Sequence, residues 1–128
     1  MRKVLLVDDM AEVHEKFRQN YKGDYELLHA RTEEEALRIA CREEGNLSLI
    51  ITDVNLDTAN PGQAHGIRLI ELLSQERRYP IVCMSRESYG QQAIVAGATE
   101  FAFKRELLAD PAKYIDRYIG GFENGKRS

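Results

Sequence analysis

Five polar residues stand directly after short apolar runs of this sequence, and their side chains form a chemically complementary set. They are Asp8, Asp9, Asp53, Ser85 and Lys104. Carboxylates that lie close together repel one another, and a hard divalent cation with oxygen ligands, such as Mg²⁺, relieves that repulsion. We therefore consider a metal site formed by the three aspartates, with a hydroxyl and an ammonium group beside it.

Each of these side chains suits one part of phosphoryl chemistry. A carboxylate such as Asp53 can attack phosphorus and form an acyl phosphate, and a neighbouring metal ion can offset the charge of the phosphoryl oxygens. The Lys104 ammonium and the Ser85 hydroxyl can bind further phosphoryl oxygens. Taken singly, an aspartate after a strand could equally be a helix cap or a turn residue, so the hypothesis depends on the whole set.

The elements that must bring these residues together alternate between strand and helix. Five short apolar runs have the pattern of strands, at Lys3–Val7, Tyr25–His29, Leu47–Thr52, Ile81–Met84 and Glu100–Phe103. The first, third and fourth are nearly continuous in apolar residues, which is typical of parallel strands buried on both faces. The alternation predicts a doubly wound α/β domain, in which functional groups gather at the carboxyl ends of the strands.

Helical patterns separate the apolar runs. Thr32 and Glu35 have the spacing of a capping box at the start of a helix, and Gly97 ends a helix of small residues. Asp110 and Pro111 predict the cap and the first position of the last helix. In total, this pattern predicts five helices.

Length and charge narrow the classes of protein further. A chain of 128 residues suits one domain, which we place at residues 1–120, with 121–128 as a tail or a truncated linker. The net charge of −3 argues against direct nucleic acid binding. No apolar run is long enough to cross a bilayer, and the start lacks the features of a signal peptide. We therefore expect a cytoplasmic protein.

The quoted motifs resemble those of a known family. From Lys3 to about Ile119 the sequence is similar to the receiver domain of bacterial two-component response regulators. The similarity is carried by Val4–Asp9, Leu49–Asp53, Pro80–Ser85, Gly97–Ala98 and Phe101–Lys104. It implies a flavodoxin-like, five-stranded parallel sheet of order 2-1-3-4-5 with five helices.

The resemblance implies a metal and a phosphoacceptor at matching positions. Asp53 would receive the phosphoryl group. Asp9 would bind Mg²⁺ directly and Asp8 largely through water, while Asp53 and the backbone carbonyl of Asn55 would complete the metal shell.

The resemblance also implies roles in switching and in loss of the phosphoryl group. Ser85 would be the switch hydroxyl, Lys104 the cation beside the phosphoryl group, and Phe101 the switch aromatic residue. Asn55 and Glu87 would tune dephosphorylation, because an amide and a carboxylate near phosphorus could hold an attacking water.

Partners follow from the same resemblance. A histidine kinase or a histidine phosphotransfer protein would donate the phosphoryl group from phosphohistidine. The surface of the fourth helix, fifth strand and fifth helix would then bind a downstream protein or a missing output domain. Such a chain is a phosphoacceptor switch that assists its own phosphotransfer and autodephosphorylation, rather than an enzyme with a separate substrate.

Two features depart from the family pattern. Arg105 stands where a proline usually follows the lysine, so we expect either a trans peptide bond or a locally altered loop there. The loop Leu56–Gly66 is several residues longer than usual. These departures leave open an interaction module that takes no phosphate. Two further classes are considered on other grounds: an aspartyl-nucleophile phosphatase, and a flavin-binding domain of the same fold. A phosphatase usually has a second carboxylate where Asn55 stands.

Overall fold

The computed structural model describes residues 2–21, 23, 25–54, 65–76, 79–86 and 90–119. Strands and helices alternate along most of the chain. The elements are β1 (Lys3–Val7), α1 (Ala11–Asn20), β2 (Glu26–Ala30), α2 (Glu33–Arg42), β3 (Leu47–Asp53), α3 (His65–Glu76), β4 (Ile81–Ser85), α4 (Gly90–Ala96), β5 (Glu100–Phe103), α5 (Lys104–Ala109) and α6 (Pro111–Tyr118). None of the helices in the described residues is long and apolar enough to span a membrane.

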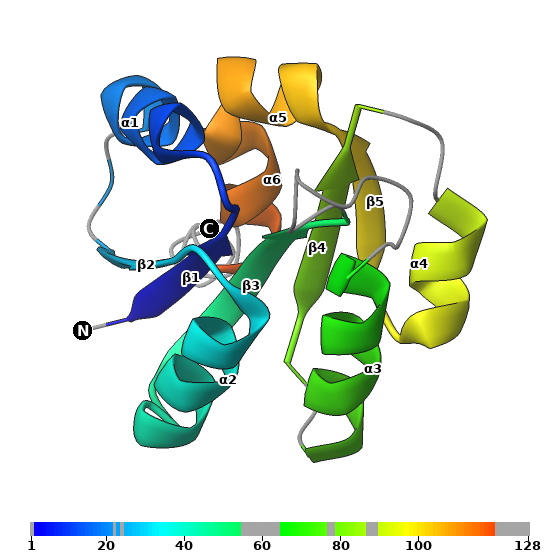
Figure 1. Cartoon of the computed structure of the whole chain (residues 1–128). Coiled ribbons are helices and arrows are strands. Elements are labelled where there is room, and N and C mark those ends of the chain that lie inside the picture. The colour runs from blue at the N-terminus through cyan, green and yellow to red at the C-terminus, as the bar shows by residue number, and fades with distance from the viewer. Residues whose placement is uncertain are drawn as a thin grey trace, which may run out of the picture.

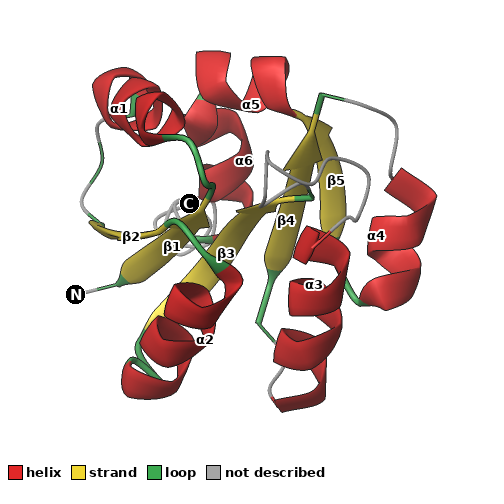
Figure 2. Cartoon of the chain, in the orientation of Figure 1, coloured by secondary structure: helices red, strands yellow, loops and turns green. Residues whose placement is uncertain are grey.

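The strands form one parallel sheet of order β2-β1-β3-β4-β5, as predicted. Helices α1, α5 and α6 cover one face, and α2, α3 and α4 cover the other (Figure 1). This arrangement gives three layers, with the sheet between two layers of helices (Figure 2). The sequence-based prediction of a doubly wound α/β domain is therefore confirmed.

Alternate residues of each strand enter different cores. On β1, Leu5 packs with the α2, α3 and α4 side, whereas Leu6 packs with the α1, α5 and α6 side. Successive strand side chains point to opposite faces of a sheet, so a strand covered on both faces needs apolar residues throughout. Because β1, β3 and β4 are almost entirely buried, the sheet holds their carboxyl ends in fixed positions.

The start of α2 follows the predicted capping pattern with one difference. The Thr32 hydroxyl accepts a hydrogen bond from the Glu35 backbone N–H at 3.0 Å, as expected for an N-cap. The Glu35 carboxylate reaches one residue further back than in a capping box, and accepts from the Arg31 backbone N–H at 2.7 Å. The cap of α2 therefore also fixes the residue that follows β2.

The described residues contain one helix more than the five predicted, because α5 forms directly after β5. With Arg105 in place of proline, the backbone continues from β5 into a helix, and the peptide bond after Lys104 is trans. Pro111 ends this helix, since the residue before a proline is pushed out of the helical region. Asp110 accordingly has φ −145° and ψ 75°, and α6 begins at Pro111.

Candidate phosphorylation site

The carboxyl ends of β1, β3, β4 and β5 bring four of the predicted side chains to one edge of the sheet. Asp8 follows β1, Asp53 and Ser85 are the last residues of β3 and β4, and Lys104 follows β5. All four side chains are buried, with at most 5% of each residue exposed. Such burial is uncommon for ionised groups unless they are paired, so this edge is chemically distinct from the rest of the molecule.

Lys104 joins the two aspartates of this edge. Its Nζ lies 2.7 Å from Asp53 Oδ2 and 2.7 Å from Asp8 Oδ2. The lysine reaches the site although Arg105 replaces the usual proline, because α5 starts at Lys104 and fixes its backbone. The predicted convergence of strands one, three and five is thus present in the structure.

Burial and mutual repulsion dominate the electrostatics of these groups. Burial, reinforced by the charge of Asp53, raises the pKa of Asp8 to about 7, although Lys104 opposes the rise. Burial alone would lower the pKa of Lys104, but the Asp53 and Asp8 carboxylates outweigh it and raise that pKa above its ordinary value. The lysine therefore stays protonated at neutral pH.

The acidic residues have the geometry of a cation site. One carboxylate oxygen from each of Asp8, Asp9 and Asp53 lies within 4.8 Å of the others. Asp8 Oδ1 already accepts from the Met10 backbone N–H at 2.9 Å, whereas Asp8 Oδ2 faces Lys104 and the site. Hard oxygen donors with an excess of negative charge fit Mg²⁺, which would also favour the ionised form of Asp8.

Gly66 explains how α3 approaches the end of β3 so closely. Its backbone N–H donates to the Val54 carbonyl oxygen at 2.6 Å. A Cβ atom at this position would lie 1.9 Å from the carbonyl oxygen of Asp53, which is far inside van der Waals contact. A residue without a side chain is thus required beside the candidate phosphoacceptor.

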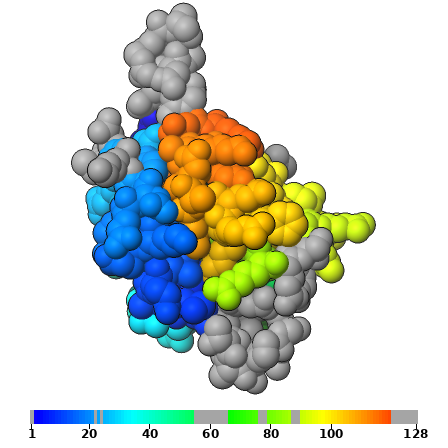
Figure 3. Space-filling view, turned by 90° about the horizontal axis from the view of Figure 1, so that it is seen from above, coloured from blue at the N-terminus to red at the C-terminus, as the bar shows by residue number. Residues whose placement is uncertain are grey.

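A cavity of about 650 Å³ opens next to Ser85 and Lys104. Its lining comes from α1, the end of β4, the end of β5 and α5, namely Lys16, Ser85, Arg86, Phe103, Lys104, Arg105, Glu106 and Leu108. Figure 3 views the molecule from the side on which α1 and α5 lie together, and the Asn20 amide joins them by donating to the Leu108 carbonyl oxygen at 2.7 Å.

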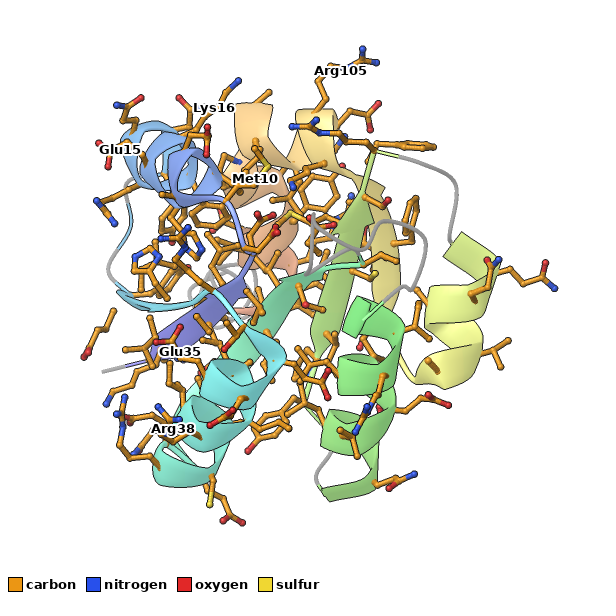
Figure 4. The ribbon with its side chains drawn as sticks, in the orientation of Figure 1. Met10, Glu15, Lys16, Glu35, Arg38 and Arg105 are labelled. Carbon is orange, nitrogen blue, oxygen red and sulfur yellow. The ribbon has the colours of Figure 1, made fainter. Side chains whose placement is uncertain are left out.

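The mouth of this cavity is positively charged and partly apolar. Lys16 and Arg105 lie at the same end of the molecule (Figure 4), and they and Arg86 are exposed. Within the described ranges, none of these three cations forms an ion pair, unlike Arg18 or Arg38. Phe103 is 45% exposed beside them. An acidic partner with an apolar contact would complement this surface.

The remaining predicted residues are placed as follows. Phe101 is partly buried, and its ring packs edge to face against Phe103, with 5.3 Å between the two ring centroids. Asn55 and Glu87 lie outside the described residues, as does most of the loop Leu56–Gly66, of which only the last two residues are described, in α3.

Sequence reasoning missed two residues that contact the acidic turn after β1, His14 and Arg31, and a third, His29, that contacts His14. His14 Nε2 lies 2.8 Å from the Asp8 carbonyl oxygen, and His14 Nδ1 lies 2.7 Å from His29 Nδ1. Arg31 donates to the Asp9 carbonyl oxygen. In the sequence, His14 is only a histidine on the apolar face of a helix, and Arg31 is only a basic residue after the second strand. Neither pattern predicts a role by itself.

Burial keeps the two histidines neutral. It lowers the pKa of His14, and with the neighbouring His14 it lowers the pKa of His29 to about 4. Burial, with the charge of Asp53, also raises the pKa of the Cys83 thiol to about 12, so this cysteine is a small apolar core residue rather than a reactive group.

Comparisons with known proteins find one matching family model and solved structures of the same fold. A family model described as the response regulator receiver domain matches residues 4–115. Among solved structures, a receiver domain protein from Clostridium thermocellum has 18% identity and a TM-score of 0.74, over 96% of this chain and 98% of the other. A chemotaxis response regulator of Vibrio cholerae has 26% identity and a TM-score of 0.67, over 93% and 99%.

A larger protein contains a similar domain. A probable two-component response regulator with a GGDEF domain has 19% identity and a TM-score of 0.77, over 96% of this chain but 51% of that protein. No match is found among the curated proteins.

Proposed function

This chain belongs to the family of response regulator receiver domains, and from that premise we propose that Asp53 accepts a phosphoryl group in a Mg²⁺-dependent signalling switch. The observation that carries the proposal is the Lys104 ammonium, held 2.7 Å from both Asp53 and Asp8 beside three clustered carboxylates. Proteins of this family are phosphoacceptor switches rather than classical enzymes, and they bind Mg²⁺ in an acidic pocket.

The proposed transfer takes place between phosphohistidine and Asp53. A carboxylate oxygen of Asp53 forms a bond to phosphorus while the bond between phosphorus and the donor's imidazole nitrogen breaks, which leaves an acyl phosphate and a neutral or protonated histidine. Asp8, Asp9 and Asp53, with the backbone carbonyl of Asn55, would hold Mg²⁺, whose charge offsets that of the phosphoryl oxygens. The Lys104 ammonium would then donate its hydrogen bond to a phosphoryl oxygen in place of a carboxylate oxygen of Asp53.

The proposed switch starts at Ser85 and ends at α4. A phosphoryl group adds a charge of roughly −1.5 to −2, and the buried Ser85 hydroxyl would donate to one of its oxygens. Phe101 would follow, since it is only partly buried and lies against Gly90 at the start of α4. Partners that bind one state better than the other would then shift the equilibrium.

The same surfaces support the proposed partners. The basic mouth of the cavity beside Ser85 would receive a histidine kinase or a histidine phosphotransfer protein through charge complementarity. Helix α4 exposes Ile94 and Val95, at 48% and 81%, and could bind a downstream protein or a fused output domain. Asn55 and Glu87 would set the rate of dephosphorylation by holding an attacking water.

Incorporation of phosphate from a small phosphodonor tests this function. The protein is incubated with phosphoramidate in the presence of Mg²⁺ or EDTA, and intact mass reports the added phosphoryl group. We expect incorporation only with Mg²⁺, and its loss in Asp53→Asn. Asp116→Asn is the matched control and should behave as the unchanged protein, because the Asp116 carboxylate lies on α6 and accepts a hydrogen bond from Tyr25 rather than from a residue of the site. No incorporation with Mg²⁺ would favour an interaction module instead.

A further inference from the structure

The turn that carries the candidate metal ligands is held by groups from outside it. The Asp8 backbone N–H donates to the Ala30 carbonyl oxygen at 3.0 Å, so the turn is attached to the end of β2. The carbonyl oxygen of Asp8 faces His14 Nε2 at 2.8 Å. The carbonyl oxygen of Asp9 accepts from Arg31 Nη2 at 3.0 Å and from Arg31 Nε at 3.3 Å. Both backbone carbonyls of the acidic pair therefore have side-chain donors.

The two histidines form a directed chain of hydrogen bonds. A carbonyl oxygen can only accept, so His14 Nε2 must carry the hydrogen that it shares with Asp8. In a neutral ring the other nitrogen, Nδ1, then accepts, which assigns the donor role to His29 Nδ1 at 2.7 Å. His29 lies on β2 opposite Leu6 of β1. His14, which is 5% exposed, is thus oriented by β2, the strand next to β1, which Asp8 follows.

Arg31 is fixed in a different way, through the cap of α2. Its backbone N–H donates to the Glu35 carboxylate, while its guanidinium spans the turn to Asp9. A positive charge beside a cation site weakens cation binding by simple repulsion. The hydrogen bonds to Asp9 must therefore supply whatever advantage this arginine gives the site.

From this geometry we propose that His14 and Arg31 are positioning residues for the Mg²⁺ site, which hold the backbone carbonyls of Asp8 and Asp9 so that the two carboxylates converge, with His29 orienting His14. The inference deepens the proposed function and depends on it, because it concerns the same metal site. Replacing a side chain that orients a metal ligand through a hydrogen bond typically changes the metal affinity by 10- to 100-fold.

Replacing His14 separates positioning from general packing. His14→Phe keeps a ring of similar size but loses the donor to Asp8. We expect the Kd for Mg²⁺, measured by calorimetry on the full chain, to rise about tenfold. Val13→Ala, which makes a defect in the neighbouring core of the same helix, is the control. It should lower the free energy of unfolding at least as much while leaving the Mg²⁺ affinity unchanged. An unchanged affinity in His14→Phe overturns the proposal for this residue.

Replacing Arg31 gives a test in which the two explanations predict changes of opposite direction in the Kd for Mg²⁺. If the arginine acted only through its charge, Arg31→Met would bind Mg²⁺ more tightly, because a repelling cation has been removed. Loss of the hydrogen bonds to Asp9 predicts the opposite, a Kd raised about threefold for an exposed side chain. Arg38→Met is the matched control, since Arg38 lies exposed on α2 (Figure 4) and its guanidinium pairs with Glu34. Tighter or unchanged binding in Arg31→Met refutes the positioning role.

The unchanged protein distinguishes failure of this inference from failure of the proposed function. If it binds no Mg²⁺ and Asp53 takes no phosphoryl group, the proposed function is wrong and the inference falls with it. If it binds Mg²⁺ and is phosphorylated, but both variants match their controls in Mg²⁺ affinity, only the positioning role is wrong. Phosphorylation rates at saturating Mg²⁺ should recover in both variants, because the defect is one of affinity.

Discussion

Asp8 is predicted to destabilise the folded protein at neutral and alkaline pH in the absence of metal. Its folded pKa is raised from 3.8 to about 7, mainly by burial and then by Asp53. The native state thus binds the Asp8 proton more tightly than the unfolded chain does. The contribution of Asp8 to the free energy of unfolding therefore falls as pH rises from about 4 through 7. One pKa unit corresponds to about 1.4 kcal/mol, which makes the full penalty about 4 kcal/mol.

The expected gain from Asp8→Asn is close to this penalty. The amide resembles the protonated carboxyl group, and the pKa of about 7 already includes the attraction between Asp8 and Lys104. We therefore expect Asp8→Asn to raise the free energy of unfolding by about 4 kcal/mol at pH 8 in EDTA, and by almost nothing at pH 4.

Urea unfolding followed by circular dichroism measures this difference directly. The variant and the unchanged protein are compared at pH 8 and pH 4 in EDTA, and then at pH 8 with Mg²⁺, which should stabilise only the unchanged protein. Asp116→Asn on α6 is the control for loss of a carboxylate. If Asp8→Asn is no more stable than the unchanged protein at pH 8 in EDTA, the proposed burial penalty is wrong.

Three further predictions concern the same edge of the sheet. Lys104→Met leaves two buried carboxylates without their cation, so it should lower the free energy of unfolding by about 3 kcal/mol at pH 8 in EDTA, as urea unfolding would show. Gly66→Ala places a Cβ against the Asp53 carbonyl oxygen, and a lower thermal midpoint together with slower phosphorylation is expected. The pKa of His29 is lowered to about 4, so the free energy of unfolding should decrease as pH falls from about 6.5 through 4. In His29→Gln this decrease should be smaller by about 1 kcal/mol, after allowance for the partial exposure of the side chain.

The positions of the site residues could be predicted because each lies at the end of a strand, and three of these strands, β1, β3 and β4, are almost entirely buried. An apolar run followed at once by Asp8, Asp53, Ser85 or Lys104 marks both the end of a strand and the edge at which the chemistry occurs. The parallel sheet then places these ends together without any further information from the sequence. Convergence at the site is a consequence of topology, which explains why a pattern of local residues was sufficient to predict it.

Contacts between side chains and backbone across elements could not be predicted in the same way. The contacts of His14 with Asp8 and His29, and of Arg31 with Asp9, depend on the register between β1 and β2 and on the angle at which α1 leaves the sheet. Neither quantity is encoded in a local pattern. The additional helix α5 was not predicted, because the replacement of the family's usual proline by Arg105 was expected to change only the peptide bond or the loop, whereas it permits a helix directly after β5.

The identity of the phosphorylated residue is the central claim, and mapping the phosphoryl group tests it most directly. The protein is treated with phosphoramidate and Mg²⁺, reduced with borohydride, and digested for mass spectrometry. Borohydride reduces an aspartyl phosphate to homoserine, which marks the modified position permanently. We predict homoserine at Asp53, in amounts that depend on Mg²⁺. Homoserine at Asp8 or Asp9 instead, or no reducible acyl phosphate in the presence of Mg²⁺, would contradict the account.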